Sequence, residues 1–140
     1  MDKIENLFEK RLLKKIPMDF EKVKSSLKIS KSKLENAKRL FESGFYGDSL
    51  LSAYTSMFHS ARALLYYEGI QEKSHYGVYV YLRERFSHKI PLELLNSLNF
   101  LREERHKILY GFEEDISKEQ VENSILNCEE FLEVIGEILK

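Results

Sequence analysis

The sequence is poor in residues that interrupt helices or cross-link chains. Its 140 residues include two prolines, six glycines and one cysteine. A single cysteine excludes an intramolecular disulfide and a cysteine-based zinc site within one chain. We interpret Cys128 as a small buried hydrophobe. Because the few prolines and glycines fall between segments with helical periodicity, an all-α protein with one reduced thiol is expected.

Long apolar runs and a strong net charge are also absent. No stretch approaches the length needed to cross a bilayer, and the first 15 residues contain acidic side chains where a secretory signal has an unbroken apolar segment. The net charge of −1 argues against a protein that coats nucleic acid through bulk electrostatics. We therefore expect a cytoplasmic protein with no membrane segment.

The composition is that of one ordinary globular domain. A chain of 140 residues that is 43% hydrophobic can bury its own core, so residues 1–140 are predicted to form a single domain. A short, peripheral N-terminal helix is predicted within residues 1–16, over about 2–14. It is expected to end before the Ile16-Pro17 pair, since the residue before proline disfavours helix.

Apolar residues recur at helical spacing through the rest of the chain. Further helices are predicted at about 20–43, 46–67, 76–86, 91–110 and from 117 onward, with a loop between Tyr67 and Tyr76. The segment 46–67 is apolar on most sides and should be the central helix. Ser117, followed by Gln120, is typical of a helix start. The pattern predicts an antiparallel up-and-down four-helix bundle with one or two extra short helices.

One arginine interrupts the apolar stripe of the predicted fifth helix. The other members of the stripe are Leu94, Leu98, Leu101, Ile108 and Phe112. A buried, unpaired guanidinium is costly. Arg105 must therefore reach the rim of the bundle or meet a carboxylate, a carbonyl or an anionic ligand.

More polar residues form a column beside Arg105, at successive i, i+4 positions: Arg102, His106 and Tyr110. Such a cluster suits phosphate, because arginine stabilises negative charge without a metal and imidazole transfers protons near neutral pH. The alternative is that Glu103 and Glu104 pair with these bases on a solvated face, while Tyr110 is a partly buried bundle residue. Spacing alone leaves both interpretations open.

The other histidines are weighed in the same way. His59, on the central helix, is interpreted first as a hydrogen-bonded structural residue and second as a ligand-binding one. His75, in the segment KSHYG, is interpreted as a cap at the start of the predicted fourth helix, and His88 as a surface residue. None has the spacing of a metal ligand, so no metal and no cofactor are expected.

Three ordered segments resemble the HEPN domain superfamily, most closely its small stand-alone prokaryotic members. They are AYTSMFHSARALLYYEGI (53–70), KSHYGV (73–78) and LREERHKILYG (101–111). The resemblance covers about residues 30–139. It implies a bundle of four or five helices that forms a homodimer, with the fifth-helix motifs of both subunits facing a shared cleft. Arg105 would then interrupt the stripe because the stripe ends in that cleft.

The resemblance also implies roles for individual residues. In many HEPN nucleases an arginine is followed by a polar residue and, a few positions later, by a histidine. Arg105 matches the arginine and His106 the polar position, whereas Tyr110 replaces the histidine. Tyrosine at this position is common in the stand-alone branch. An alternative is that His106, which follows Arg102 by one helical turn, takes over the role of the missing histidine.

The resemblance, together with these residues, implies several alternative functions. The first is a binding protein in which Arg102, Arg105 and His59 hold a nucleotide or RNA phosphate at a dimer cleft, as one half of a toxin–antitoxin pair with a minimal nucleotidyltransferase. The second is a metal-independent endoribonuclease toxin that uses Arg105, His106 and Tyr110. The third is a non-catalytic dimeric adaptor. A lysine-rich face of the predicted second helix, which includes Lys31 and Lys38, would supply sequence-independent contacts to an RNA backbone.

Overall fold

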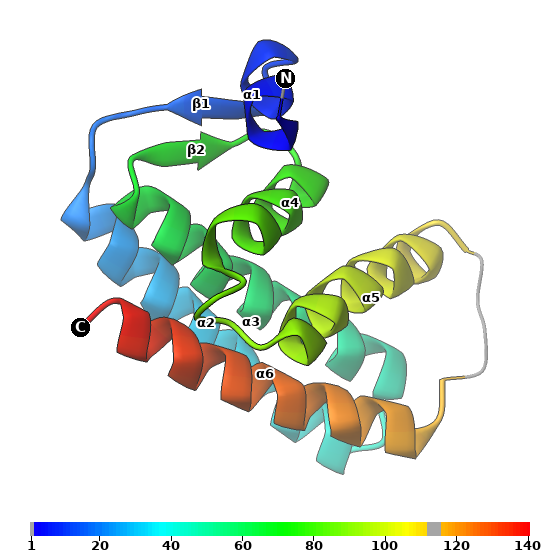
Figure 1. The fold of residues 1–140 in the computed structure, drawn as a ribbon. Helices are drawn as coiled ribbons and strands as arrows, with labels where there is room; N and C mark the ends of the chain where they lie inside the picture. The colour runs from blue at the N-terminus through cyan, green and yellow to red at the C-terminus, as the bar shows by residue number, and fades with distance from the viewer. Residues whose placement is uncertain (1, 112–115) are drawn as a thin grey trace.

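The order of helices predicted from the sequence is confirmed, and the structure adds a small two-stranded sheet. The structure is a computed structural model that describes residues 2–111 and 116–140. Within these residues the chain forms α1 (Lys3–Glu9), β1 (Leu13–Lys15), α2 (Phe20–Glu42), α3 (Tyr46–Tyr67), β2 (Ile70–Glu72), α4 (His75–Phe86), α5 (Leu92–Leu109) and α6 (Lys118–Ile138). The helices pack as a bundle, with α1 and the two strands at one end (Figure 1). None of the described helices is both long enough and apolar enough to span a bilayer.

Side-chain caps fix where four of the helices begin. Asp2, Asp19, Ser74 and Ser117 each accept a hydrogen bond from a backbone N–H in the first turn of the helix that follows. Such a cap contributes about 1 kcal/mol, because it satisfies a donor that has no partner within the helix. The predicted start of the last helix at Ser117 is confirmed, since its Oγ accepts from the N–H of Gln120 at 3.1 Å.

The central helix α3 supplies most of the core, as predicted. It packs against α2, α5 and α6, and Leu50, Met57 and Leu64 on it are fully buried. Figure 1 shows α3 running through the middle of the bundle beside α2. The single cysteine is buried against the same helix, with Cys128 Sγ 3.5 Å from the carbonyl oxygen of Ala53. Burial raises the pKa of the Cys128 thiol to about 12, which agrees with its interpretation as a buried hydrophobe.

A row of serines lies between α2 and α3. Ser30 and Ser56 donate to each other's carbonyl oxygens at 2.7 and 2.6 Å, and both are fully buried. Ser49 donates to the carbonyl oxygen of Ala37 at 2.7 Å, and Ser52 to that of Lys33 at the same distance. Small side chains let the two helices approach closely, and the hydroxyls are satisfied without water. These polar groups hold the two longest helices together.

The prediction for the N-terminal segment was wrong beyond Glu9. The first helix ends there instead of near residue 14, and Arg11 adopts a left-handed backbone conformation with φ 60°. The chain then forms β1, which pairs antiparallel with β2. The predicted loop between Tyr67 and Tyr76 therefore contains a strand. Three-residue strands are too short to leave a period in the sequence, and buried Leu13 looks like part of an amphipathic helix.

Candidate functional site

The apolar stripe of α5 leaves the bundle toward its C-terminal end. Leu94, Leu98 and Leu101 are at most 2% exposed, whereas Arg105 is half-buried. Phe112, the last predicted member of the stripe, lies outside the described residues. Arg105 therefore sits where the buried part of the helix gives way to the surface.

Arg105 contacts an aromatic ring rather than a carboxylate. Its guanidinium carbon lies 5.9 Å from the centre of the Tyr54 ring, a residue of α3 that is 2% exposed. Among residues 2–111 and 116–140, no carboxylate comes within ion-pair distance of it. A cation over an aromatic face gains roughly 0.5–2 kcal/mol but keeps its full charge. Arg105 can therefore still bind an anion.

The two glutamates beside Arg105 pair elsewhere. Glu103 lies 3.8 Å from the guanidinium of Arg102, and Glu104 lies 3.7 Å from the ammonium of Lys107. Glu104 is only 5% exposed, so it does not belong to a solvated face. The alternative that Glu103 and Glu104 pair with the bases of the cluster therefore holds for the Glu103–Arg102 pair, whereas neither glutamate pairs with Arg105.

His75 is the residue that the sequence interpretation missed. It was interpreted as a helix cap, but Ser74 caps α4, since its Oγ accepts from the N–H of Gly77. The Nδ1 atom of His75 instead forms a 2.7 Å hydrogen bond with the hydroxyl of Tyr54. Its ring stacks on Phe58, with 4.0 Å between ring centres and 13° between planes. His75 is thus fixed on two sides by α3.

Burial, reinforced by neighbouring cations, keeps the His75 ring neutral. Burial is the largest cause that lowers its pKa, to about 4, and the positive charges of Arg105 and then Arg102 add to it. Smaller contributions come from Arg62 and His59. At neutral pH, an uncharged imidazole therefore lies within the field of two arginines of α5.

His59 belongs to the same neighbourhood. Its ring lies edge-on to Phe58, with ring centres 5.7 Å apart. Its buried Nδ1 atom has no hydrogen-bond partner among the described residues, so the interpretation of a hydrogen-bonded structural histidine fails at that atom. Burial, followed by the charges of Arg62 and Lys33, lowers the pKa of His59. Of the predicted ligand-binding residues, Arg102, Arg105 and His59 thus all influence His75.

Arg62 is committed to a different partner. It forms a 2.8 Å ion pair with Glu72 of β2, whose side chain is 7% exposed. Burial raises the pKa of Glu72, and the charge of Arg62 acts in the opposite direction. The pair fastens β2 to α3 close to the start of α4.

His106 and Tyr110 lie further along α5 and face outward. Their ring centres are 4.6 Å apart, and Tyr110 is 66% exposed. The alternative that Tyr110 is a partly buried bundle residue is therefore wrong. The two rings form an exposed aromatic pair where α5 ends.

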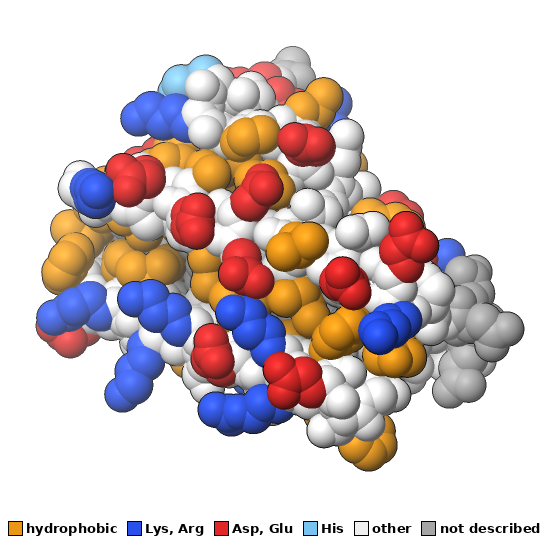
Figure 2. Space-filling model, turned by 90° about the horizontal axis from the view of Figure 1, so that it is seen from below, with side chains coloured by type: hydrophobic (Ala, Val, Ile, Leu, Met, Phe, Trp, Pro, Cys, Tyr) orange, Lys and Arg blue, Asp and Glu red, His pale blue; other side chains and the backbone are white. Residues whose placement is uncertain are grey.

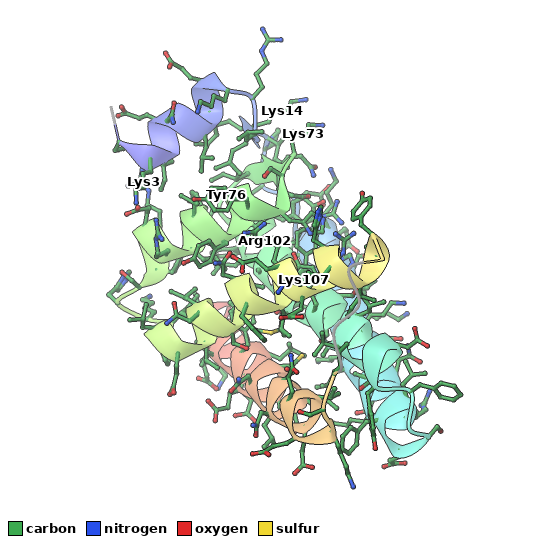
Figure 3. All side chains as sticks on the ribbon, turned by 90° about the vertical axis from the view of Figure 1, so that its right-hand side faces the viewer. Lys3, Lys14, Lys73, Tyr76, Arg102 and Lys107 are labelled. Atoms are coloured by element: carbon green, nitrogen blue, oxygen red, sulfur yellow. The ribbon has the colours of Figure 1, made fainter. Side chains whose placement is uncertain are left out.

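An exposed tyrosine extends the cluster onto α4. The guanidinium carbon of Arg102 lies 5.2 Å from the ring centre of Tyr76, which is 47% exposed, and its Nε donates to Asn99 at 3.1 Å. Figure 3 shows Tyr76 and Arg102 side by side at the boundary between α4 and α5. A half-exposed ring beside an arginine offers a stacking surface for a nucleobase.

The lysine-rich face of α2 is a weaker candidate. Lys24 lies 3.2 Å from Glu21, and Lys38 lies 3.8 Å from Glu35 and 3.7 Å from Glu129 of α6. Figure 2 shows the underside of the bundle, where basic and acidic side chains are interspersed. The described residues contain no cluster of histidine, cysteine and carboxylate groups able to hold a metal ion.

Comparison with known proteins identifies the fold family. The sequence pattern of the HEPN domain matches residues 23–138, most of the chain. The protein belongs to the HEPN domain family. The resemblance seen in the sequence is thereby confirmed, and the cluster around His75 and Arg105 lies within the matched region of this HEPN domain.

Two archaeal proteins are similar to part of this HEPN chain. UPF0332 protein PH1297 of Pyrococcus horikoshii is 45% identical over 58 residues, which are 41% of each chain. The Methanocaldococcus jannaschii protein named "Putative toxin MJ0605" is 40% identical over 58 residues, 41% of this chain and 43% of the relative. The matched stretch thus spans about two fifths of each relative's length.

Proposed function

We propose that this HEPN protein binds single-stranded RNA, or a nucleotide, through phosphate contacts on α5. The observation that carries the proposal is Arg105, a half-buried guanidinium held over Tyr54 with no carboxylate partner among the described residues. Arg102 supplies a second positive charge one turn earlier on α5. Two guanidinium groups match the oxygens of a phosphate diester, and each charge-assisted hydrogen bond is worth roughly 1.5–3 kcal/mol.

Other residues of the cluster have complementary roles in this proposal. Tyr76 offers its exposed ring to a base, and the His59 ring on α3 contacts Phe58, on which His75 stacks. His106 and Tyr110 extend the surface beyond Arg105. RNA is favoured over an isolated phosphate because the half-exposed ring of Tyr76 lies against Arg102, and an aromatic ring beside a cation is typical of proteins that bind single strands.

We further propose that the site is completed by a second copy of the chain. Leu109 and Tyr110, at the end of α5, are 50% and 66% exposed, and adjoining exposed apolar side chains are suited to a subunit interface. A two-fold axis here would bring two Arg105 side chains to one cleft. Molar mass in solution, measured with and without RNA, tests this arrangement; a monomer under both conditions would contradict it.

The binding proposal is tested by fluorescence anisotropy with a labelled oligouridylate. Arg105→Ala is expected to weaken binding about tenfold, equivalent to ~1.4 kcal/mol. Arg85→Ala is the matched control, since it removes one exposed positive charge of α4 away from the cluster. Equal effects of the two substitutions would mean that only net charge matters and would overturn the assignment of Arg105.

A second candidate function is that of a metal-independent endoribonuclease toxin. Two observations favour it: a histidine does lie beside Arg105, although it comes from α4, and a relative carries the word toxin in its name. Labelled RNA incubated with the protein and a chelator tests for cleavage. Cleavage by the wild type but not by Arg105→Ala would establish the activity, and intact RNA with Arg105-dependent binding would leave the binding function.

A minimal nucleotidyltransferase remains the partner that we propose for this HEPN protein. The support is the family assignment together with the toxin-named relative. Co-expression with a minimal nucleotidyltransferase, followed by size-exclusion chromatography, tests the pairing. A non-catalytic adaptor would form the complex but show no RNA binding that depends on Arg105.

A further inference from the structure

His75 has one engaged ring nitrogen and one that is available. Its Nδ1 is bonded to the Tyr54 hydroxyl, whereas its Nε2 has no hydrogen-bond partner among the described residues. Nor is Nε2 one of the buried side-chain nitrogens without a partner, so solvent reaches it. A hydrogen bond to one ring nitrogen fixes the orientation of a histidine ring. The arrangement leaves Nε2 able to bond to a ligand.

The charged groups around this ring are unbalanced. From α3 the ring faces Tyr54, His59 and Arg62, and from α5 it faces Arg102 and Arg105. Arg62 is neutralised by Glu72, and Arg102 is partly offset by Glu103. Arg105 has no such partner among the described residues and is the strongest electrostatic influence on His75. An anion bound to Arg105 would remove the main charge that keeps the imidazole neutral.

We propose that His75 is the proton-accepting residue of the phosphate site: when an RNA phosphodiester occupies Arg102 and Arg105, the Nδ1 atom of the imidazole takes up a proton, and Nε2–H of the resulting imidazolium donates to a phosphate oxygen. The proton comes from solvent. Tyr54 positions the ring, because its hydroxyl can accept from Nδ1–H in the charged form as readily as it donates in the neutral form. This inference rests on the proposed function of the α5 surface.

The chemical consequence is a coupling between RNA binding and pH. A ligand that favours the protonated ring must bind more tightly as the pH falls toward the free ring's titration range. If binding raises the His75 titration midpoint from about 4 to about 5.5, affinity is about fourfold higher at pH 5 than at pH 7. A phosphodiester does not titrate in this range, so the proton uptake belongs to the protein.

The first measurement is nuclear magnetic resonance of the full chain labelled with nitrogen-15 in its four histidines. The probe is a 2′-O-methyl oligouridylate with hydroxyl ends, which cannot be cleaved and carries only phosphodiester charges. Ring-nitrogen shifts report the protonation and tautomer of each histidine. Saturation with the probe is expected to raise the midpoint of His75 by about one and a half pH units. His88, which stacks on Phe86 at the end of α4, should not change.

Variants separate this inference from the binding function. His75→Gln should bind a few-fold more weakly at pH 5 and lose the rise in affinity between pH 7 and pH 5, whereas His88→Gln should keep both. Tyr54→Phe keeps the ring beneath Arg105 but removes the hydroxyl. It should leave His75 in place with a mixed tautomer, which tests the positioning role even if His75→Gln folds poorly.

The outcomes are distinct. Binding that is accompanied by an upward shift at His75 supports the inference. Binding without that shift, or with the shift at His106 instead, overturns the role of His75 and leaves the RNA-binding proposal intact. Absence of binding to the oligonucleotide at both pH values overturns both proposals.

Discussion

Polar groups lie within apolar surroundings in two regions of this molecule. In one region they are hydrogen-bonded to each other, and in the other they are not. Between α2 and α3, the hydroxyls of Ser30 and Ser56 are bonded to carbonyl oxygens across the interface and are sealed from solvent. In the surroundings of His75, the guanidinium of Arg105 and the Nδ1 of His59 have no polar partner among the described residues. Satisfied polar groups stabilise a fold, whereas unsatisfied ones cost stability and are kept where a ligand completes them.

The largest effect is expected from breaking the serine interface. Ser56→Val removes the buried hydrogen bond that the Ser56 hydroxyl donates to the carbonyl oxygen of Ser30 and adds volume between the packed helices, so a loss of about 2–4 kcal/mol is expected. Urea denaturation of this variant and of Ser32→Val, an exposed position on α2, makes the comparison. Equal stability of the two variants would show that the interface tolerates a larger, apolar side chain.

The next effect is the pH dependence of stability that comes from His75. Its folded pKa of about 4 lies below its ordinary value of 6.5, so the unfolded chain binds the proton more readily. The contribution is fully present above pH 6.5 and is lost as the pH falls toward 4. For a half-buried ring, screening by solvent reduces the loss to roughly 1–2 kcal/mol.

This pH effect is measured as a difference between proteins. Unfolding free energies of the wild type and His75→Gln at pH 7 and pH 4.5 give a double difference from which other titrating groups, such as Glu72, cancel. A smaller fall for His75→Gln is the expected result. Parallel curves would show that His75 is not held neutral by the fold.

A smaller effect, of opposite sign, is expected at the arginine. Arg105→Leu completes the apolar stripe and removes a partly desolvated charge, so stability should stay level or rise by up to about 1 kcal/mol. RNA binding should fall at the same time. Thermal melts and anisotropy on one preparation check both. A clear loss of stability would show that Arg105, like Ser30 and Ser56, stabilises the fold.

The smallest effect is expected on the lysine-rich face of α2. Lys31→Glu combined with Lys38→Glu should leave stability nearly unchanged, because Lys38 makes only solvent-exposed ion pairs. If RNA follows this face, affinity should fall a few-fold and its dependence on salt should become less steep. RNA-binding titrations at two salt concentrations test this. If the affinity and its salt dependence are unchanged, RNA contacts only the α4–α5 side of the bundle.

The sequence predicted the helices well because their signals are local. Ser117 and Gly44 mark helix ends through caps and a left-handed turn, and α3 has the same bounds as predicted. The strands β1 and β2 were missed because three residues leave no period, and their pairing joins segments far apart in the chain. A local sequence pattern is enough to predict a helix, whereas a short strand can be predicted only when its distant partner is known.

The candidate site divides in the same way. Arg105 stood out because it breaks a periodic stripe on its own helix. His75 did not, because its role depends on Tyr54 and Phe58, which precede it by 21 and 17 residues and contact it only because α3 packs against α4. A histidine after a serine at a helix start satisfies every local rule for a cap. Only the fold shows that the serine already has that role.

The small sheet has a consequence for where the boundaries of this HEPN domain are drawn. Matched residues begin at 23, yet the backbone N–H of Lys73, two residues before His75, donates to the carbonyl oxygen of Leu12 at 2.8 Å. The strand β1 thereby anchors the chain just before it enters α4. A version trimmed to the family's own limits would keep its long helices and lose this anchor. The N-terminal segment lies at the periphery of the fold, yet it helps to position His75. Truncation, proteolysis or a protein bound to this segment would therefore alter the position of the His75 ring without touching the helical bundle.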